Sequence, residues 1–344
     1  MHSGIKRLGV SGIVIATLLL AACGATSTPA ANSTARASLK IMVGGLSKQI
    51  YLPNKLAAQL GYFDEQKLDV TLIDEASGQS SEDEVVAGQV DAGSGSYNHT
   101  IELQKAGKAM ECVVQLDIAP GEAEVVSTKA AASITSPADL KGKNLGVTEI
   151  GSGTQTLTQA ILKKAGVDPK NANYIPVGAG NTFIAAMQQG SIDAGMTTEP
   201  TISRVVSQGL GKVLVDLRSP QSTQQALGGN YPFICVFMAT SFVKANKGVV
   251  QRMVNAYVKT LKWINTHTAA EIAAKMPPDY YAGDQNLYVT ALNNQKAIFS
   301  SDGKMPSDGP QTVLGIEQQI GKVSASDVIN LSQTYTNEFA GNAP

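Results

Sequence analysis

The chain has 344 residues, enough for two domains, and 43 % of them are hydrophobic, so sizeable cores can be buried. Its 27 basic and 28 acidic residues nearly balance, which argues against a nucleic-acid-binding protein. The three cysteines and three histidines lie far apart, so we expect neither a disulfide-built fold, nor a metal centre, nor a cofactor.

The first residues are typical of an export signal. Two basic residues precede an apolar run over residues 8–20, which ends in Ala21-Ala22-Cys23. Small residues before a cysteine resemble the bacterial lipobox, and the apolar run is short for a membrane span. We therefore expect residues 1–22 to be a lipoprotein signal peptide and Cys23 to carry the lipid. The alternative is an ordinary signal peptide with a chance cysteine.

The next segment, residues 23–37, is small, polar and without periodicity, so we expect a flexible tether. A strand is predicted over residues 39–43. A helical pattern follows, in which leucines recur at every fourth position until Gly61. A second strand is predicted over residues 68–73, and a further segment ends at Gly88.

The same order of elements returns later in the chain. A strand is predicted over residues 144–147, a helix ends at Gly166, a strand covers residues 174–177, and a helix over residues 183–189 ends at Gly190. Gly166 follows Gly61 by 105 residues and Gly190 follows Gly88 by 102. Glycine at a helix end commonly supplies a left-handed residue. The repeated order predicts two α/β lobes of related topology.

We expect the lobes to be joined by a two-strand hinge around a central cleft. The first lobe is predicted to span residues 38–127 and, after a return near residues 233–236, residues 236–344 with their helices. The second lobe is predicted to span residues 128–235, which places the other crossing near residues 127–130. A helix is expected over residues 249–267, where apolar residues form one stripe.

Polar, glycine-rich turns follow several predicted strands, at the edge where α/β sheets bind ligands. Helix N-termini there carry unpaired N–H groups, and glycine permits close backbone approach. Ordinary turn and cap chemistry is the alternative for any single turn. Core packing is the alternative for Tyr51 and Tyr97, and a structural cap is the alternative for Glu199. Lys48 is interpreted as a solvated surface lysine. The predicted ligand-binding residues are Ser47, Tyr51, Gly78, Gln79, Ser94, Ser96, Tyr97, Ser152, Gly153, Thr154, Asn181 and Glu199.

Enzymatic function is not expected. The chain has neither the G-x-S-x-G motif of a nucleophile elbow nor a phosphate-binding P-loop motif. His99 is interpreted as a structural residue and not as a general base. Cys112 and Cys235 both fall in predicted strands, and either a disulfide or two buried thiols would fit.

Several stretches resemble the nitrate-, sulfonate- and taurine-binding proteins of ABC importers, which are related to the thiamine-precursor-binding family. They follow the family's order over most of residues 41–200. The matching stretches are Leu60-Gly61-Tyr62-Phe63, Leu68-Asp69-Val70, Ala87-Gly88-Gln89-Val90-Asp91-Ala92-Gly93, Asp139-Leu140-Lys141-Gly142-Lys143, Leu145-Gly146-Val147, Gly151-Ser152-Gly153-Thr154, Ala165-Gly166-Val167-Asp168-Pro169, Asp193-Ala194 and Glu199-Pro200.

The resemblance implies a periplasmic-binding-protein-like fold and a monomer that works with an ABC permease and ATPase. It implies a location in the periplasm or on the cell surface, anchored to a membrane by lipid, and places Ser152 and Thr154 where sulfonate binders hold the anionic group. Gly44-Gly45-Leu46-Ser47-Lys48 lacks a substrate-selective aromatic residue, and Glu65-Gln66-Lys67 lacks the family's usual glycine. Sulfonate, taurine, nitrate, a pyrimidine and a carboxylate therefore all stay open as ligands, and a sensor role is an alternative to transport.

Overall fold

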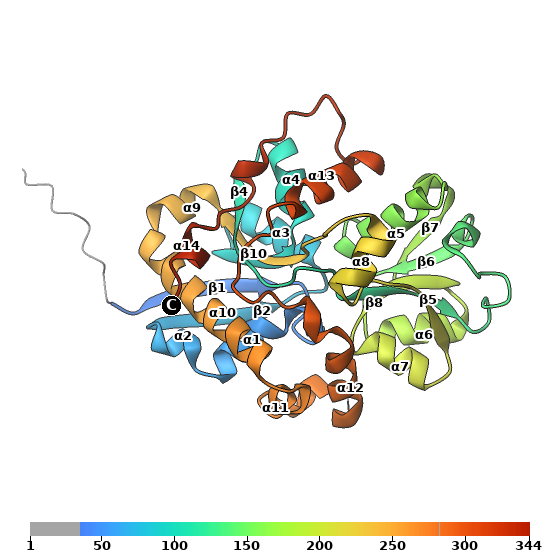
Figure 1. The fold of residues 1–344 in the computed structure, drawn as a ribbon, viewed down its shortest axis with the longest axis horizontal. Coiled ribbons are helices and arrows are strands. Elements are labelled where there is room, and N and C mark those ends of the chain that lie inside the picture. Colours follow the sequence, from blue (N-terminus) through green and yellow to red (C-terminus); the bar gives the residue numbers. More distant parts are fainter. Residues whose placement is uncertain (1–34, 282) are drawn as a thin grey trace, which may run out of the picture. The chain divides into compact units, whose positions relative to one another are not determined.

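The computed structural model describes residues 35–281 and 283–344 (Figure 1). The predicted signal peptide, Cys23 and most of the predicted tether lie outside these residues. Two mixed five-stranded sheets form the framework, and each is covered by helices, which confirms the expected α/β fold with two lobes. Within the described ranges, no helix combines the length and apolar character needed to cross a membrane.

The first lobe contains the sheet with strand order β2-β1-β3-β10-β4. Strand β1 is parallel to β2 and β3, whereas β10 lies antiparallel between β3 and β4. The strands span Ala37–Val43 (β1), Leu68–Asp74 (β2), Ala92–Ser96 (β3), Met110–Gln115 (β4) and Ile234–Ala239 (β10).

Helices from both ends of the described chain cover this sheet, so blue and orange-red segments meet in Figure 1. They span Leu52–Gln59 (α1), Tyr62–Glu65 (α2), Gly78–Val86 (α3), Asn98–Lys105 (α4), Thr240–Ala245 (α9), Lys247–Thr266 (α10), Ala269–Ala273 (α11), Gln285–Gln295 (α12), Gly309–Gln319 (α13) and Glu338–Gly341 (α14). Short 3-10 helices span Gln49–Tyr51 (η1), Pro278–Tyr281 (η4), Lys296–Ile298 (η5) and Leu331–Gln333 (η6).

The second lobe contains the sheet with strand order β7-β6-β8-β5-β9, in which β5 lies antiparallel between β8 and β9. Its strands span Glu122–Ser127 (β5), Asn144–Val147 (β6), Asn173–Pro176 (β7), Ala194–Thr198 (β8) and Gly211–Asp216 (β9). Its helices span Gly153–Lys164 (α5), Asn181–Gln189 (α6), Thr201–Ser207 (α7) and Pro220–Leu227 (α8), with 3-10 helices over Pro137–Leu140 (η2) and Pro169–Asn171 (η3).

The two lobes share one topology, as the repeated order of elements predicts. Strands β1, β2, β3 and β4 take the same places in their sheet as β6, β7, β8 and β9 take in the other. In each sheet the remaining antiparallel strand, β10 or β5, lies between the third and fourth members of the series. Gly61 and Gly166 have left-handed φ angles of 74° and 77°, which glycine adopts without a steric penalty.

One predicted boundary is wrong. The sheet pairing assigns Glu122–Ser127 to the second lobe, so the first crossing comprises residues 116–121 and not residues 127–130. The return crossing comprises residues 228–233, close to the expected place. Sequence order misleads here because β5 directly follows β4, yet it pairs with strands that come later.

The crossing segments lie side by side. The Leu116 amide donates to the Ile234 carbonyl at 2.8 Å, and the Phe233 amide donates to the Asp117 carbonyl at 2.8 Å. Their antiparallel pairing agrees with the predicted two-strand hinge. Such a pair of strands can flex together while the backbone hydrogen bonds of each sheet stay intact.

Strand β10 forms the middle of the first lobe's core. All five residues from Ile234 to Met238 are buried, as expected for a strand covered on both faces. A Cβ on Gly93 would lie 2.5 Å from the Phe237 ring, so the glycine makes room for that ring. The glycine-rich stretch at residues 93–95 is therefore packed strand β3, whereas the sequence predicted a turn there.

Candidate functional site

A cavity of about 20 Å³ lies between the lobes. A space of this size holds about one water molecule, so the lobes enclose it closely. The first lobe and the crossing strands contribute Lys48, Ile50, Tyr51, Gly78, Ser96 and Phe233, and the second lobe contributes Glu122, Thr148, Ser152, Gly153, Thr154 and Thr198. Six of the twelve predicted ligand-binding residues therefore line this cavity: Tyr51, Gly78, Ser96, Ser152, Gly153 and Thr154.

The start of helix α5 forms one wall. Ser152 is the N-cap, because its Oγ accepts a hydrogen bond from the Gln155 amide. The amides of Gly153 and Thr154 belong to the first turn, whose N–H groups have no partner inside the helix and carry partial positive charge. A Cβ on Gly153 would lie 2.6 Å from the Phe233 ring, so glycine lets the helix approach the crossing strand.

The hydroxyls of Ser152 and Thr154 already hydrogen-bond inside the second lobe. Their two oxygens are 2.7 Å apart, and Thr154 Oγ1 accepts from the Thr148 amide at 2.9 Å. Ser152 Oγ also donates to the Glu149 carbonyl. These bonds fix the loop that aims the α5 amides at the cavity. Direct ligand contact by the two hydroxyls stays a prediction.

Lys48 is a buried cation at the cavity, not the solvated surface lysine that the sequence predicted. Its side chain is 8 % exposed, and Nζ donates to the carbonyl oxygens of Gly44 and Ala76 at 2.6 and 2.7 Å. Burial lowers the pKa of this ammonium to about 8. Gly45 has a φ of +127°, and a Cβ there would lie 2.5 Å from Lys48 Cε, so the glycine turn makes room for the lysine.

A buried carboxyl group from β5 faces the same space. Glu122 is 2 % exposed and lines the cavity, and its Oε2 finds no hydrogen-bond partner in the described part of the chain. Burial raises the pKa of Glu122 well above its usual value. Sequence reasoning missed this residue. The available signal was a pair of acids, at 122 and 124, within an otherwise apolar strand.

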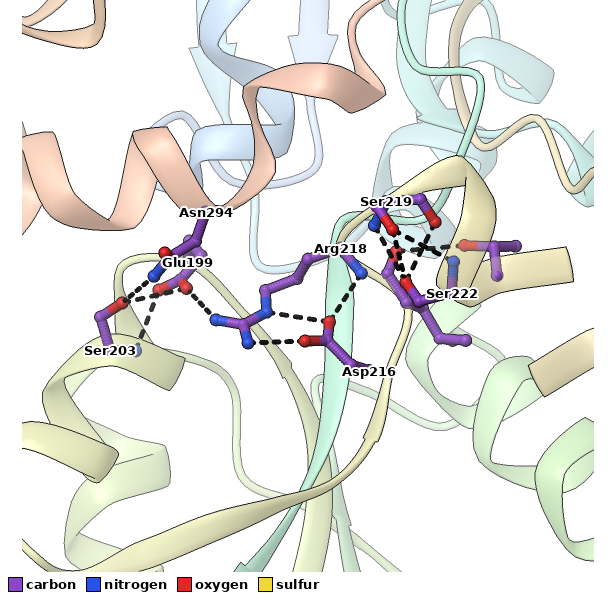
Figure 2. A network of polar contacts seen from close by, with 9 residues as sticks. Glu199, Ser203, Asp216, Arg218, Ser219, Ser222 and Asn294 are labelled. Atoms are coloured by element: carbon purple, nitrogen blue, oxygen red, sulfur yellow. Dashed lines mark hydrogen bonds and ion pairs between the residues drawn. The ribbon is translucent and has the colours of Figure 1, made fainter. Parts of the chain in front are cut away.

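A second cavity, of about 70 Å³, adjoins the first through the shared residues Lys48 and Thr198. Ser47 and Glu199 line it, as do residues from α7 and η4. The Glu199 carboxylate is fully buried and accepts from the amide and hydroxyl of Ser203 and from Arg218 Nη1 at 2.7 Å. Figure 2 shows this network, in which the guanidinium also contacts Asp216.

Glu199 therefore caps the start of α7 and holds an internal ion pair, which agrees with the structural alternative considered for it. Asn294, from α12 of the first lobe, donates to Ser203 Oγ at 3.4 Å (Figure 2). The network thus reaches across the interface between the lobes.

Four predicted ligand-binding residues line neither cavity. Ser94 accepts from Asn54 inside the first lobe, and the Tyr97 hydroxyl pairs with Thr334 in the core. Asn181 accepts from Arg204, and Gln79 lies beside Gly151 of the other lobe. Position near a strand end did not separate these residues from the cavity lining, because Gln79 and Asn181 lie in the first turns of α3 and α6 and Ser94 lies inside β3.

The lobes contact each other around the cavity. The Glu149 carboxylate, from the second lobe, accepts from Ser77 Oγ and from Ser80 Oγ at the start of α3. The Gln49 amide donates to the Glu199 carbonyl at 3.0 Å, and Lys322 Nζ donates to Thr156 Oγ1 at 2.7 Å. The described conformation is therefore closed.

Other reactive groups lie outside the cavity lining. Cys112 and Cys235, in the neighbouring strands β4 and β10, are buried free thiols. His99 forms a buried pair with Glu82, with Nδ1 2.9 Å from Oε2, in agreement with a structural role. In residues 35–281 and 283–344, no group of three or more histidine, cysteine, aspartate or glutamate side chains is placed to hold a metal ion.

This two-lobed fold is that of periplasmic solute-binding proteins. The alkanesulfonate-binding protein SsuA from Xanthomonas axonopodis pv. citri, solved with bound MOPS, is 16 % identical with a TM-score of 0.70, over 88 % of this chain and 99 % of that one. The periplasmic nitrate-binding protein NrtA from Synechocystis PCC 6803 is 14 % identical with a TM-score of 0.73, over 89 % of this chain and 88 % of that one.

The chain belongs to the NMT1/THI5-like family, whose model matches residues 51–270. A protein of known structure from Bordetella bronchiseptica RB50 is 33 % identical, with a TM-score of 0.84, over 89 % of this chain and 96 % of that one. No curated protein sequence matches the chain. The family agrees with the resemblance stated from the sequence.

Proposed function

We propose that this protein is the extracytoplasmic solute-binding component of an ABC importer and captures a small polar ligand in the cavity between its lobes. Anionic ligands of the sulfonate, taurine and nitrate type are included in this proposal. We further propose that Cys23 carries a lipid anchor, that the protein acts as a monomer with a permease and an ATPase, and that it performs no chemistry on the ligand.

The observation that supports ligand capture is the composition of the cavity. Polar groups of both lobes converge there, including the Lys48 ammonium, the Glu122 carboxyl and the α5 amides. Buried polar groups of this kind are costly unless a partner satisfies them. A small ligand that contacts both lobes would satisfy them and favour the closed conformation over an open one.

The experiment compares what the protein retains from a mixture of small metabolites. Wild-type protein is dialysed against the mixture, washed and denatured, and the released molecules are identified by mass spectrometry. Gly153→Leu places a side chain where even a Cβ would lie 2.6 Å from Phe233. We expect the wild type to retain a small polar molecule and this variant to lose it.

Gly315→Leu is the matched control. Gly315 lies in α13, and a Cβ there would meet nothing within 4 Å. This variant should retain the same molecule as the wild type. Retention of nothing by the wild type, or of the same molecules by all three proteins, contradicts capture in this cavity.

A further inference from the structure

The Glu122 carboxyl group is out of place in a site built for a simple anion. It lies in the cavity wall, 2 % exposed, with Oε2 lacking a partner among the residues described. Lys48 lines the same cavity and interacts electrostatically with Glu122, but the hydrogen bonds of its ammonium go to the carbonyl oxygens of Gly44 and Ala76. The protein therefore leaves this carboxyl for another partner.

Further acids lie behind Glu122. Asp117 is fully buried on the crossing strand, and both of its carboxyl oxygens lack a partner in the described residues. Glu124 follows on the same face of β5 and is also fully buried, with a hydrogen bond from Thr158. Burial favours the neutral form of Glu122, and a cation bound beside it would favour the ionised form and compensate for that burial.

The same cavity also offers groups of the other polarity. Lys48 and the first-turn amides of α5 are suited to an acidic or otherwise electron-rich group of the ligand. Hydroxyls complete the lining, and Ser96 Oγ and Thr198 Oγ1 have no partner within the part of the chain described. Thr198 is the β8 partner of Glu122, so its hydroxyl lies beside the carboxyl.

We propose that the ligand carries a cationic nitrogen group, an ammonium or an amidinium, which Glu122 binds in the cavity. The inference rests on the proposed function and narrows it. Nitrate and unsubstituted alkanesulfonates are poor ligands under this proposal, because they offer the Glu122 carboxyl no N–H donor and no positive charge.

The experiment uses probe pairs that differ in the nitrogen group. Taurine is compared with ethanesulfonate, β-alanine with propionate, and acetamidine with acetamide, and nitrate serves as a plain oxyanion. Each is tested at millimolar concentration for its effect on the melting temperature of the whole protein, because a ligand that binds the folded state alone raises it. Calorimetry then gives the affinity of each probe that binds.

We expect at least one probe with a cationic nitrogen group to stabilise the wild type. The matched probe without that group should bind about ten- to a hundredfold more weakly, which is the usual effect of losing one charged hydrogen bond. Glu122→Gln, which keeps the shape of the side chain, should remove this difference within the pair. Glu317→Gln is the control, because it alters a fully buried acid of α13 that does not line the cavity.

The inference is overturned if no probe with a cationic nitrogen group stabilises the protein, or if the two probes of every pair bind equally. It is also overturned if the probes without the cation bind better, or if Glu122→Gln keeps the preference of the wild type. A melting curve of Glu122→Gln without probe verifies that the variant is folded. The retention experiment decides the proposed function separately, since a retained molecule without a cationic nitrogen would support capture and still contradict this inference.

Discussion

Buried titratable side chains dominate the chemistry of this protein at the scale of single residues. Glu124 is fully buried, with Oε2 accepting from Thr158, and burial raises the pKa of its carboxyl group to about 8. Glu124 in turn contributes to the raised pKa values of Glu122 and Tyr174. A carboxyl with a raised pKa keeps its proton in the folded protein at pH values where the unfolded chain has released it.

The stabilising effect of protonated Glu124 is complete below its unfolded pKa of 4.5 and is lost as pH rises toward about 8. We therefore expect Glu124→Gln, which cannot ionise, to lose less stability than the wild type between pH 5 and pH 8. Urea unfolding at the two pH values measures the difference. Glu338→Gln, at a half-exposed surface ion pair, should behave like the wild type. An equal loss in Glu124→Gln would contradict the assigned pKa.

The site was less predictable than the fold, for reasons that single residues illustrate. Ser152, Gly153 and Thr154 were found because their motif opens a well-patterned helix directly after a strand. Lys48 was missed because nothing local distinguishes a lysine that folds back onto a glycine turn from one in solvent. Glu122 was missed because the residues that surround it depend on the sheet in which β5 pairs.

At the scale of elements, the sequence predicted the strands and helices that recur in the two lobes, and the long helix α10. Glycines in the left-handed conformation end the corresponding helices, and apolar runs give the strands. The exception is the partner of β5. Its apolar residues fit either sheet, so local pattern cannot decide the pairing, which long-range packing determines.

Two helix caps, one at the cavity and one away from it, allow an effect on stability to be distinguished from an effect on ligand binding. Ser152 caps α5 at the cavity, and Thr268 caps α11 with a capping box away from it. Ser152→Ala and Thr268→Ala should each lower the free energy of unfolding by about 0.5–2 kcal/mol. We expect Ser152→Ala alone to weaken ligand retention, because it releases the loop that aims the α5 amides. Equal retention by both variants would show that the α5 cap does not support the site.

At the scale of the whole molecule, one polar contact between the lobes lies at the N-terminus of α3. The Glu149 carboxylate binds two hydroxyls at the N-terminus of α3, where negative charge is favoured. The contact joins the two lobes directly beside the cavity, since Gly78 of the same helix lines it. It therefore biases the unliganded protein toward closure.

We expect Glu149→Gln to shift the unliganded protein toward an open conformation, because the neutral amide interacts less favourably with the helix N-terminus. Small-angle X-ray scattering should then give a larger radius of gyration than for the wild type. Glu65→Gln removes a surface ion pair with Lys259 inside the first lobe and should leave the radius unchanged. An unchanged radius in Glu149→Gln would mean that other contacts keep the lobes together.

The placement of β10 between β3 and β4 has a consequence for biogenesis. A ribosome releases the chain from its N-terminus, so β1 to β4 emerge early but lack the strand that joins β3 to β4. All five strands of the other sheet, from β5 to β9, are available before β10 is synthesised. The middle of the polypeptide can therefore assemble first, and the outer parts complete their sheet around it afterwards.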